Sequence, residues 1–539
     1  MKQFDYIIVG AGSAGCLLAN RLSANPENQV LLLEAGGKNT HLNIQTPAAF
    51  YKLFRTKYDW NYDSVPQVHM NNRPMFQPRG KTLGGCSSIN AMIYIRGHKS
   101  DYDTWADLGN KGWSYKEVLP YFKRFEANER LSDTYHGTEG ELNISDHQTR
   151  NILSEKLVEA AQQAGYAYND DFNGARQEGF GYYQLTVKDG KRWSAVEAFL
   201  KPVQSRQNLH IITHALTHKV LIENKKACGV LYEKGGKLQE VKAGREVILT
   251  AGAFNSPQLL MLSGIGNAQK LKSLDVPVVA DLPGVGKNLQ DHLVGGLIMN
   301  CNQNITLDRV EDFPAILVNL WKLMVNKKGP FTSNVAEAGG FVRTQKDLPA
   351  PDLQFHFAPS YFVRHGAENP KSGNGYSLGA TLLAPESRGE VRLASSDPRD
   401  KILIDPNYLS AERDMQTMVK GYHIARKIFD QPAFDPYRGS HFLPDEALDD
   451  DTDIKGFVRE WVETLYHPVG TCKMGSDDMA VVDDQRRVRA IRNLRVADAS
   501  VMPLIVRGNT NAPTMMIAEK AADMILKSKP STVLKTSKV

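Results

Sequence analysis

The 539-residue sequence has few cysteines, and none of them stands in a metal-binding or redox pattern. There is no C-x-x-C pair and no histidine cluster beside a cysteine, so a zinc site is not expected and no metal is predicted. A sparse, odd-numbered set favours a reducing compartment. The scattered residues are Cys16, Cys86, Cys228, Cys301 and Cys472.

Long apolar runs are also missing. No run reaches about 18 residues, the length that indicates a membrane-spanning helix. The first expected strand begins almost at Met1, so no signal or transit peptide is expected. Together these features predict a cytoplasmic protein, and peripheral association with the inner membrane stays open.

Neither charge predominates. The formal net charge of +5 is small for this length, and no block of Lys and Arg stands out. Nucleic acid is therefore not expected as a partner. The length suits a few average domains or two large α/β domains, and the oligomeric state stays unknown.

What the sequence does contain begins with a strand–turn–helix motif. Residues 6–9 form a short apolar run that predicts a buried parallel strand, and residues 16–22 are expected to form a helix. Gly10, Gly12 and Gly15 lie between them with the spacing G-x-G-x-x-G. These glycines allow a tight turn, close approach of a pyrophosphate and close packing of helix on strand.

A second strand and an acid complete this unit. Residues 29–33 predict another buried strand, and Glu34 follows it, placed to accept hydrogen bonds from ribose hydroxyls. The helix N-terminus offers free N–H groups and a positive dipole end to phosphates. We therefore predict a dinucleotide site, which the motif alone does not assign to FAD or NAD.

Two further segments are dense in small residues. Residues 80–90 contain Gly84, Ser88 and Asn90, and residues 250–266 run from a strand through a small-residue turn into a helix that contains Pro257 near its start. Both allow backbone N–H groups to meet a flat ligand. Each could also be a structural turn or a helix cap.

These motifs, together with three near the C-terminus, resemble those of the glucose–methanol–choline (GMC) oxidoreductases. The C-terminal motifs are Y-H-P-V-G-T-C-K-M-G at residues 466–475, L-R-V-A-D-A-S at 494–500 and G-N-T-N-A-P-T at 508–514. The resemblance covers residues 4–527. Within the family, the chain is most similar to bacterial alcohol dehydrogenases that use quinone-type acceptors, with choline dehydrogenases close behind.

The resemblance implies an α/β fold: a Rossmann-like FAD-binding domain built from separated segments, with an inserted α+β (sheet-plus-helix) substrate domain. We expect the first domain to comprise residues 1–155, 195–310 and 455–528. The substrate domain is expected to comprise residues 156–194 and 311–454, with residues 529–539 as a tail. Residues 352–357 are expected as a strand with Leu353, Phe355 and Phe357 on one face.

FAD is the cofactor that the resemblance implies. Some members tether FAD through a histidine, but Ile89 stands at that position here, so binding should be non-covalent. The expected contacts are Gly10, Gly12, Ser13, Ala14, Gly15, Glu34, Ala35, Gly84, Ser88, Asn90, Ala91, Val220, Ala251, Asp498, Ala499, Ala512, Pro513 and Thr514. Val220 is included because it stands in a strand that lies near adenine in relatives.

Alcohol oxidation needs a base for the hydroxyl proton, and histidine titrates near neutrality. His467, in the family motif H-P-x-G-T, is the expected base. Asn511 is expected to pair with it across the substrate oxygen, although it also stands where a helix cap would. His356 and His423 are expected to be structural.

The resemblance implies oxidation of a primary alcohol, aliphatic or aromatic, to the aldehyde by hydride transfer to flavin N5. The electrons would pass to a quinone-type or other non-oxygen acceptor. Alternatives are a choline dehydrogenase, an alcohol oxidase that produces hydrogen peroxide and, more remotely, a hydroxynitrile lyase. A choline site would need an aromatic cage and an acid, for which the candidates are Phe331, Phe355, Phe357, Tyr361, Phe362 and Glu337.

Overall fold

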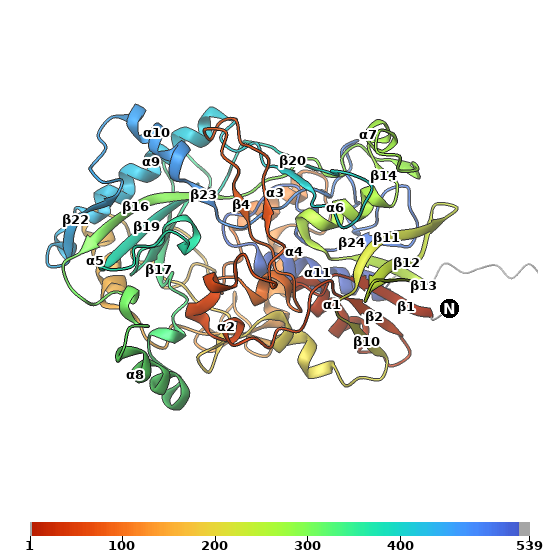
Figure 1. Ribbon diagram of the computed structural model, residues 1–539, viewed down its shortest axis with the longest axis horizontal. Helices are drawn as coiled ribbons and strands as arrows, with labels where there is room; N and C mark the ends of the chain where they lie inside the picture. Colours follow the sequence, from red (N-terminus) through yellow and green to blue (C-terminus); the bar gives the residue numbers. More distant parts are fainter. Residues whose placement is uncertain (1–2, 528–539) are drawn as a thin grey trace, which may run out of the picture.

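The computed structural model of the chain describes residues 3–527. Two seven-stranded sheets lie at opposite ends of an elongated molecule, one at the right of Figure 1 and the other at the left. The expected tail, residues 529–539, lies outside the described residues. Within residues 3–527, no helix is long and apolar enough to span a membrane.

The first sheet has a parallel core with the order β10-β2-β1-β13, and β24 pairs in parallel with the end of β13. Its strands β1 and β2 are the two apolar runs that the sequence predicts, and both are buried because helices and loops cover them. The bounds are β1 Gln3–Val9, β2 Val30–Leu33, β10 Leu209–Ile212, β11 Leu216–Glu223, β12 Lys226–Lys234, β13 Lys237–Leu249 and β24 Leu494–Val496.

An antiparallel meander of β11, β12 and the first half of β13 extends this sheet. Residues 209–223 form two strands rather than one. The chain turns at His214, whose φ of 55° lies in the left-handed region that ends a strand. As a result β10 pairs with β2, while β11 pairs with β12.

Helix α1, Ser13–Leu22, follows β1 and packs against the C-terminal helix α11, Asn511–Lys527. Gly10 has a φ of +102°, a conformation that suits glycine. A Cβ atom at Gly15 would lie 1.9 Å from the Gly10 carbonyl oxygen, so only glycine permits this packing of helix on strand. The N-termini of α1 and α11 are thereby held at the carboxyl edge of the sheet.

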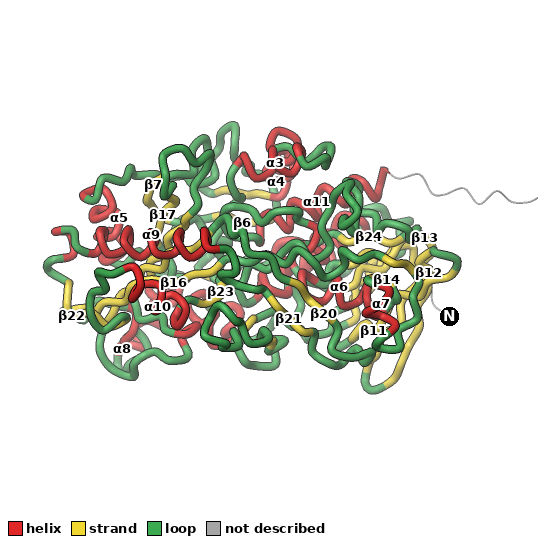
Figure 2. Tube along the Cα trace, turned by 90° about the horizontal axis from the view of Figure 1, so that it is seen from above, coloured by secondary structure: helices red, strands yellow, loops and turns green. Residues whose placement is uncertain are grey.

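The second sheet is antiparallel, with the order β22-β16-β19-β18-β17-β7, and β23 pairs with β16. Helices α5, α9 and α10 cover one of its faces (Figures 1 and 2). The bounds are β7 Gly179–Tyr182, β16 Leu293–Cys301, β17 Ala338–Val342, β18 Leu353–Ala358, β19 Gly375–Leu382, β22 Arg438–Leu443 and β23 Glu463–Thr464, with α5 Ile152–Gln163, α9 Glu412–Phe429 and α10 Asp451–Trp461.

Alternation along β18 separates the two faces of this sheet. Leu353, Phe355 and Phe357 share the apolar core beneath the helices, as the sequence predicts. His356 points the other way, toward the middle of the molecule, where it lines a cavity. The uncovered face of the second sheet therefore forms one wall of the candidate site.

Several expected domain limits cut through the second sheet and its helices: the limit at 155/156 falls inside α5, the limit at 454/455 falls inside α10, and β23 lies beyond the latter. The boundary at residue 310 assigned residues 293–301 to the first domain, but β16 pairs with β19, β22 and β23 in the second sheet. Its sequence contains Gly295 and Gly296 and shows no clear alternation of apolar and polar residues, so the sequence does not predict a strand here. The other limits stay a proposal.

Shorter elements connect the two halves. The remaining strands are β3 Tyr62–Asp63, β4 Phe76–Gln77, β5 Glu126–Asn128, β6 Leu142–Ile144, β8 Val187–Lys188, β9 Lys191–Arg192, β14 Ile265–Gly266, β15 Ala280–Asp281, β20 Glu390–Arg392 and β21 Leu403–Asp405. The remaining α-helices are α2 Leu42–Gln45, α3 Lys99–Asp107, α4 Tyr115–Phe125, α6 Gly252–Leu262, α7 Ala268–Lys272 and α8 Ala315–Trp321.

Candidate active site

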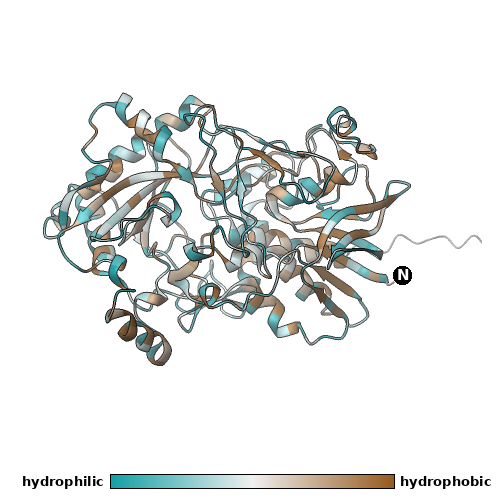
Figure 3. Cartoon of the chain, in the orientation of Figure 1, coloured by the Kyte–Doolittle hydropathy of each residue, from teal (hydrophilic) through white to brown (hydrophobic). Residues whose placement is uncertain are grey.

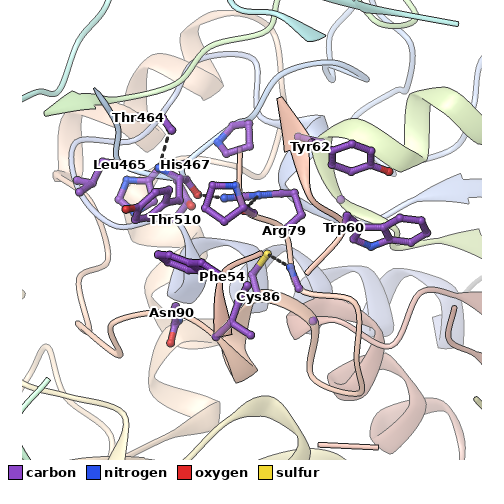
Figure 4. Close-up of a pocket in the computed structure, with 18 of the residues that line it drawn as sticks. Phe54, Trp60, Tyr62, Arg79, Cys86, Asn90, Thr464, Leu465, His467 and Thr510 are labelled. Atoms are coloured by element: carbon purple, nitrogen blue, oxygen red, sulfur yellow. Dashed lines mark hydrogen bonds between the residues drawn. The ribbon is translucent and has the colours of Figure 1, made fainter. Parts of the chain in front are cut away.

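A cavity of about 650 Å³ lies between the two sheets. Its lining runs from the glycine motif at Gly10 and Gly12, past the segment around Asn90, to His467 and the second sheet. Figure 4 shows His467, Arg79, Phe54 and Asn90 around this space. Segments far apart in the sequence thus share one elongated site.

The first-sheet end of the cavity fits a dinucleotide. A Cβ atom at Gly12 would meet nothing closer than the Gly85 Cα atom at 4.0 Å, and one at Gly252 would meet nothing within 4 Å. Ser13 and Asn511, at the starts of α1 and α11, both line this end. Open backbone beside two helix N-termini is suited to phosphate groups.

Glu34 lies at the end of β2 and lines the same region. Its carboxylate accepts hydrogen bonds from the backbone N–H groups of Ala11 and Gly36, at 2.9 and 2.8 Å. Burial raises the pKa of Glu34 to about 7, and these two donors only partly oppose that rise. Hydroxyl donors from a ribose would stabilise the charged form further.

Asp498 also lines the cavity, but its carboxylate is already occupied. One oxygen accepts the Gly252 N–H at 2.9 Å and the Ser256 hydroxyl at 2.6 Å. The other accepts the backbone N–H and hydroxyl of Ser500, at 2.9 and 2.6 Å. The side chain therefore fastens the start of α6 to the segment after β24, which leaves its backbone to face a ligand.

His467 lies at the junction of the two halves, and its hydrogen bonds assign its protonation. His292 Nε2 lies 3.2 Å from the Leu383 carbonyl oxygen, which can only accept, so Nε2 of His292 carries the proton. Burial lowers the pKa of His292 to about 3, so its Nδ1 is bare and accepts. His467 Nδ1, 3.0 Å away, must then be the donor.

The other nitrogen of His467 is consequently free to take a proton. Burial, and then the nearby His292, hold the pKa of His467 well below its ordinary value, so the ring is neutral. Its Nε2 lies 3.3 Å from Asn509 Nδ2, which donates to it. A neutral imidazole with a bare Nε2 beside an amide donor is the arrangement required of a general base.

The supporting residues fix both partners. Asn509 Oδ1 accepts from Gln354 Nε2 at 3.2 Å, which turns the amide NH₂ toward His467. Asp291 Oδ1 accepts the backbone N–H groups of His292 and His467, at 2.9 and 2.8 Å. Asp291 Oδ2 accepts from the hydroxyl of Tyr408 at 2.6 Å. Asp291 therefore fixes the backbone of both histidines, and with it the position of their rings.

Asn511 does not pair with His467, contrary to the expectation. Its Oδ1 accepts the Ser13 hydroxyl at 2.7 Å and so joins the N-termini of α11 and α1. Asn509, two residues earlier, contacts the imidazole instead, because it stands in the irregular segment before the helix, which begins only at Asn511. Both asparagines stand in G-N-T-N-A-P-T, and their identity alone does not tell them apart.

Most of the expected cofactor residues line the cavity, but six do not. Val220 is buried away from it, and Thr217 lines the cavity in its place, because only the start of β11 reaches the site. Ser88 is fully buried and donates to the Leu83 carbonyl at 2.7 Å. The six are Gly15, Gly84, Ser88, Val220, Ala512 and Pro513. Gly15 instead serves the packing of α1 described above.

The second-sheet end of the cavity is largely apolar. Phe362 lines it, and Phe357 borders it although its side chain belongs to the core on the other face of β18, whereas Phe331, Phe355 and Tyr361 do not line it. The acid candidate, Glu337, is also absent from the lining, since its oxygens accept from Ser154 and Ser333, both at 2.7 Å.

A different carboxylate, Glu463, lines this end but is neutralised by basic neighbours. Arg73 lies 2.6 Å from it, Arg364 3.3 Å and His365 3.2 Å. Although burial raises its pKa, His365 and Arg73 bring the pKa of Glu463 below its ordinary value. Its charge is therefore satisfied within the protein.

Three of the residues that build this site carry no recognisable motif. His292 and Asp291 follow the glycine-containing run at residues 284–286, and Arg79, which donates to the Tyr466 carbonyl at 2.5 Å, precedes Gly80. The position of Asp291 and His292 just before β16, and the loop that carries Arg79, bring these residues beside His467. The adjacency of Arg79 to the small-residue segment at residues 80–90 was the one available signal.

Comparisons with known proteins identify the family of the chain. The GMC oxidoreductase family models match residues 4–294 and 385–518. The chain is 49% identical to the alcohol dehydrogenase [acceptor] of Pseudomonas putida over 530 residues, covering 97% of this chain and 96% of that protein. It is 44% identical to the mitochondrial choline dehydrogenase of Homo sapiens over 543 residues, covering 98% and 90%.

A solved structure gives the same picture. The pyridoxine 4-oxidase from Mesorbium loti superposes with a TM-score of 0.89 at 32% identity, covering 98% of this chain and 100% of that one. The expected α/β fold with a nucleotide-binding sheet is confirmed, and GMC oxidoreductases bind FAD, which the open glycine backbone and Glu34 are suited to hold. The chain is a member of the GMC oxidoreductase family.

Proposed function

We propose that this protein is an FAD-dependent dehydrogenase that oxidises an uncharged primary alcohol with an apolar body to its aldehyde. The electrons removed from the alcohol pass to a quinone or another non-oxygen acceptor, in a reducing, cytoplasmic setting. The observation that carries the proposal is the bare Nε2 of a neutral His467 beside an amide donor, in an apolar part of the cavity. The similarity to an alcohol dehydrogenase [acceptor] supports the reaction class.

Each residue has a distinct task in this reaction. Asn509 donates to the oxygen of the alcohol and holds it at His467, whose Nε2 takes the hydroxyl proton. Once Nε2 carries this proton it no longer accepts from Asn509, so the Asn509 amide donates to the substrate oxygen alone, while His467 Nδ1–H still donates to His292. FAD, when bound along the glycine segments, supplies the acceptor for the hydrogen and the two electrons that leave the alcohol carbon.

The substrate end of the cavity favours a neutral alcohol over choline. A quaternary ammonium needs an aromatic cage, usually helped by an unpaired carboxylate. Although the aromatic residues Phe50, Phe54, Trp461 and Tyr466 line the cavity, its carboxylate Glu463 is bound by two arginines and a histidine and so is not free to pair with an ammonium group. The 44% identity to a choline dehydrogenase keeps choline as the second candidate.

A panel of substrates with one dye acceptor separates these two functions. With primary alcohols from ethanol to decanol, kcat/KM should rise with chain length until the cavity is full. Each buried methylene should raise it by a factor that corresponds to up to ~0.8 kcal/mol of binding free energy. Choline and glucose should be poor substrates. If choline gives a higher kcat/KM than every neutral alcohol, the protein is a choline dehydrogenase.

Anaerobic and aerobic assays separate the remaining alternatives. Alcohol added without oxygen should bleach the flavin absorbance, whereas a lyase would leave it unchanged. Reoxidation by a quinone should then be much faster than by oxygen. Hydrogen peroxide formed at the rate of alcohol consumption in air would identify an oxidase.

We also propose that FAD is bound without a covalent link. Ile89, at the position where some family members have the tethering histidine, lines the cavity but is otherwise packed against Ile44 and Leu53. Its side chain has no nucleophilic atom. Acid precipitation should release all the yellow flavin into the supernatant, and flavin retained in the pellet would contradict this proposal.

A further inference from the structure

One segment of the chain exposes apolar side chains at a density found nowhere else among the described residues. Of the seventeen large hydrophobic residues that are exposed, seven lie between Phe313 and Val325. Phe313 is 81% exposed and Met324 73% exposed. The full set is Phe313, Leu317, Val318, Leu320, Trp321, Met324 and Val325. Residues 313–328, which include α8, are called the apolar projection below.

The projection extends away from the body of the protein. Figure 1 shows α8 at the lower left, outside both layers, and Figure 3 shows it strongly hydrophobic beside a mostly hydrophilic surface. The other exposed apolar residues are distributed over distant elements. A clustered apolar surface of this kind marks an interaction site, whereas isolated exposed apolar residues are ordinary.

The pattern within α8 is the reverse of a helix that packs on its own protein. Its one buried residue is polar: Asn319 turns inward, and its Nδ2 donates to the Val310 carbonyl at 2.9 Å. Leu317 and Trp321, four residues apart in α8, share the outward side, and Met324 in the π-helical turn Lys322–Asn326 that follows is also exposed. The fold therefore anchors this helix through an amide and presents its apolar face to the surroundings.

Basic residues border the apolar face. Lys322, Lys327 and Lys328 follow Trp321 and are all exposed. Lys327 pairs with Asp189 at 3.1 Å, but both side chains are more than half exposed, so the pair is weak. Within residues 3–527, no ion pair is recorded for Lys322 or Lys328. Two cationic side chains are thus free beside the apolar face.

We propose that the apolar projection docks the protein onto the surface of an anionic lipid bilayer. An exposed helix with apolar residues on one side, an interfacial tryptophan and flanking lysines is the composition of an in-plane membrane anchor. The lysines meet anionic headgroups while Leu317, Trp321 and Met324 enter the boundary with the acyl chains. No helix within residues 3–527 crosses the bilayer, so the contact is peripheral.

A second copy of the chain explains these features less well. In a twofold contact between two projections, the lysines of both copies would come close together, and like charges repel. The remaining exposed apolar residues of the described chain are scattered, so no second apolar surface is available to receive the projection. A lipid surface satisfies both the apolar face and the positive charge.

The position of the projection gives the docking a consequence for catalysis. Glu311, just before the projection, pairs with Lys52 at 2.5 Å, on the 3₁₀ helix Pro47–Leu53. Phe50 of that helix and Phe54 after it line the cavity. Docking would bring this side of the cavity toward the lipid, a source of apolar alcohols and lipid-soluble acceptors. This consequence rests on the proposed function, whereas the lipid binding itself does not.

Flotation of the FAD-loaded full chain with vesicles tests the proposal. Vesicles are made of phosphatidylcholine alone or mixed with phosphatidylglycerol, and no alcohol or acceptor is added. The protein should float with the anionic vesicles, and bind neutral ones at least ~10-fold less. Leu317→Ser, Trp321→Ser and Met324→Ser together should reduce binding to anionic vesicles at least ~10-fold. Lys322→Glu with Lys328→Glu should do the same at low salt.

A matched control replaces three exposed apolar residues elsewhere. Val68→Ser, Leu238→Ser and Met479→Ser remove comparable side chains from distant surfaces and should leave flotation unchanged. Turnover of a water-soluble alcohol with a soluble dye should be equal in all variants. Failure of the unmodified chain to float, or equal flotation of the projection variant, would overturn the proposal. A vesicle-independent dimer that the projection variant loses would assign the surface to a second copy instead.

Discussion

At the level of single residues, the protonation of His467 depends on His292. The Leu383 carbonyl fixes the proton of His292 on Nε2, and its Nδ1 then accepts from His467. His292 is absent from the cavity lining, so it acts on the reaction only through His467. It is a positioning residue for the base.

Replacement of His292 separates this role from simple packing. His292→Leu removes the acceptor for His467 Nδ1–H, so the rate of flavin reduction should fall about 10–100-fold, the usual effect of a lost supporting partner. His292→Gln keeps an oxygen that can accept, so it should recover much of that loss. The readout is stopped-flow reduction across pH, at equal FAD content. Equal rates for the two variants would contradict the assigned tautomer.

Glu34 gives FAD binding a predictable pH dependence. Its pKa is raised to about 7 in the unliganded protein, and ribose hydroxyls would favour the carboxylate, so binding releases a proton. Affinity for FAD should therefore increase as pH rises from 6 to 8, by at most ~tenfold per unit. Glu34→Gln should flatten this dependence, whereas the exposed Glu27→Gln should not. Titration of the apoprotein by flavin fluorescence measures both, and weaker binding at higher pH would contradict the account.

At the level of elements, the starting point of α11 determines which asparagine faces the base. The helix begins at Asn511, whose side chain is held by Ser13 of α1, and Asn509 lies in the irregular segment before it. The sequence predicts the strand–turn–helix of the glycine motif because periodicity and glycine spacing are local. It misses the choice between Asn509 and Asn511 because that choice depends on contacts with distant residues, namely His467 and Ser13.

Replacement of Asn509 or of Asn511 by alanine should therefore affect different properties of the enzyme. Asn509→Ala removes the donor to the alcohol oxygen and should slow flavin reduction about 10²-fold with FAD retained. Asn511→Ala breaks the link between α11 and α1 and should mainly raise the dissociation rate of FAD. Reduction kinetics and FAD loss during dialysis are measured on both. A larger loss of reduction rate in Asn511→Ala would restore the pairing that the sequence suggested.

At the level of the whole molecule, two sheets of different construction enclose one cavity. The parallel sheet could be predicted because its strands are short apolar runs flanked by glycine motifs. The second sheet was only partly predictable: β18 alternates clearly, while β16, with its two central glycines, does not. His292 directly precedes β16, so missing that strand also hid the partner of the base.

Neutral histidines whose ring nitrogens are shielded from water should make the whole fold sensitive to acid. Burial lowers the pKa values of His147, His292 and His356 to about 3, against about 6.5 in the unfolded chain. The unfolded state therefore binds more protons, so their contribution to stability is complete above pH 6.5 and is lost as pH falls toward 3. Each contributes a slope of about 1.4 kcal/mol per pH unit in that window.

His147→Leu tests this at a site outside the cavity lining. The free energy of unfolding is measured in urea between pH 4.5 and 6. Its slope against pH should be smaller than in the parent by about 1.4 kcal/mol per pH unit, which corresponds to one proton. An unaltered slope in His147→Leu would show that His147 is protonated in the folded state.

The central claim, that His467 is the base for a neutral alcohol, is tested most directly by anaerobic stopped-flow reduction of the flavin by 1-octanol. His467→Gln and the parent are compared at equal FAD content, with His423→Gln as the exposed control. The account predicts that His467→Gln reduces its flavin ~10²–10⁴-fold more slowly, while the control matches the parent. Reduction of His467→Gln by 1-octanol at the parental rate would contradict it.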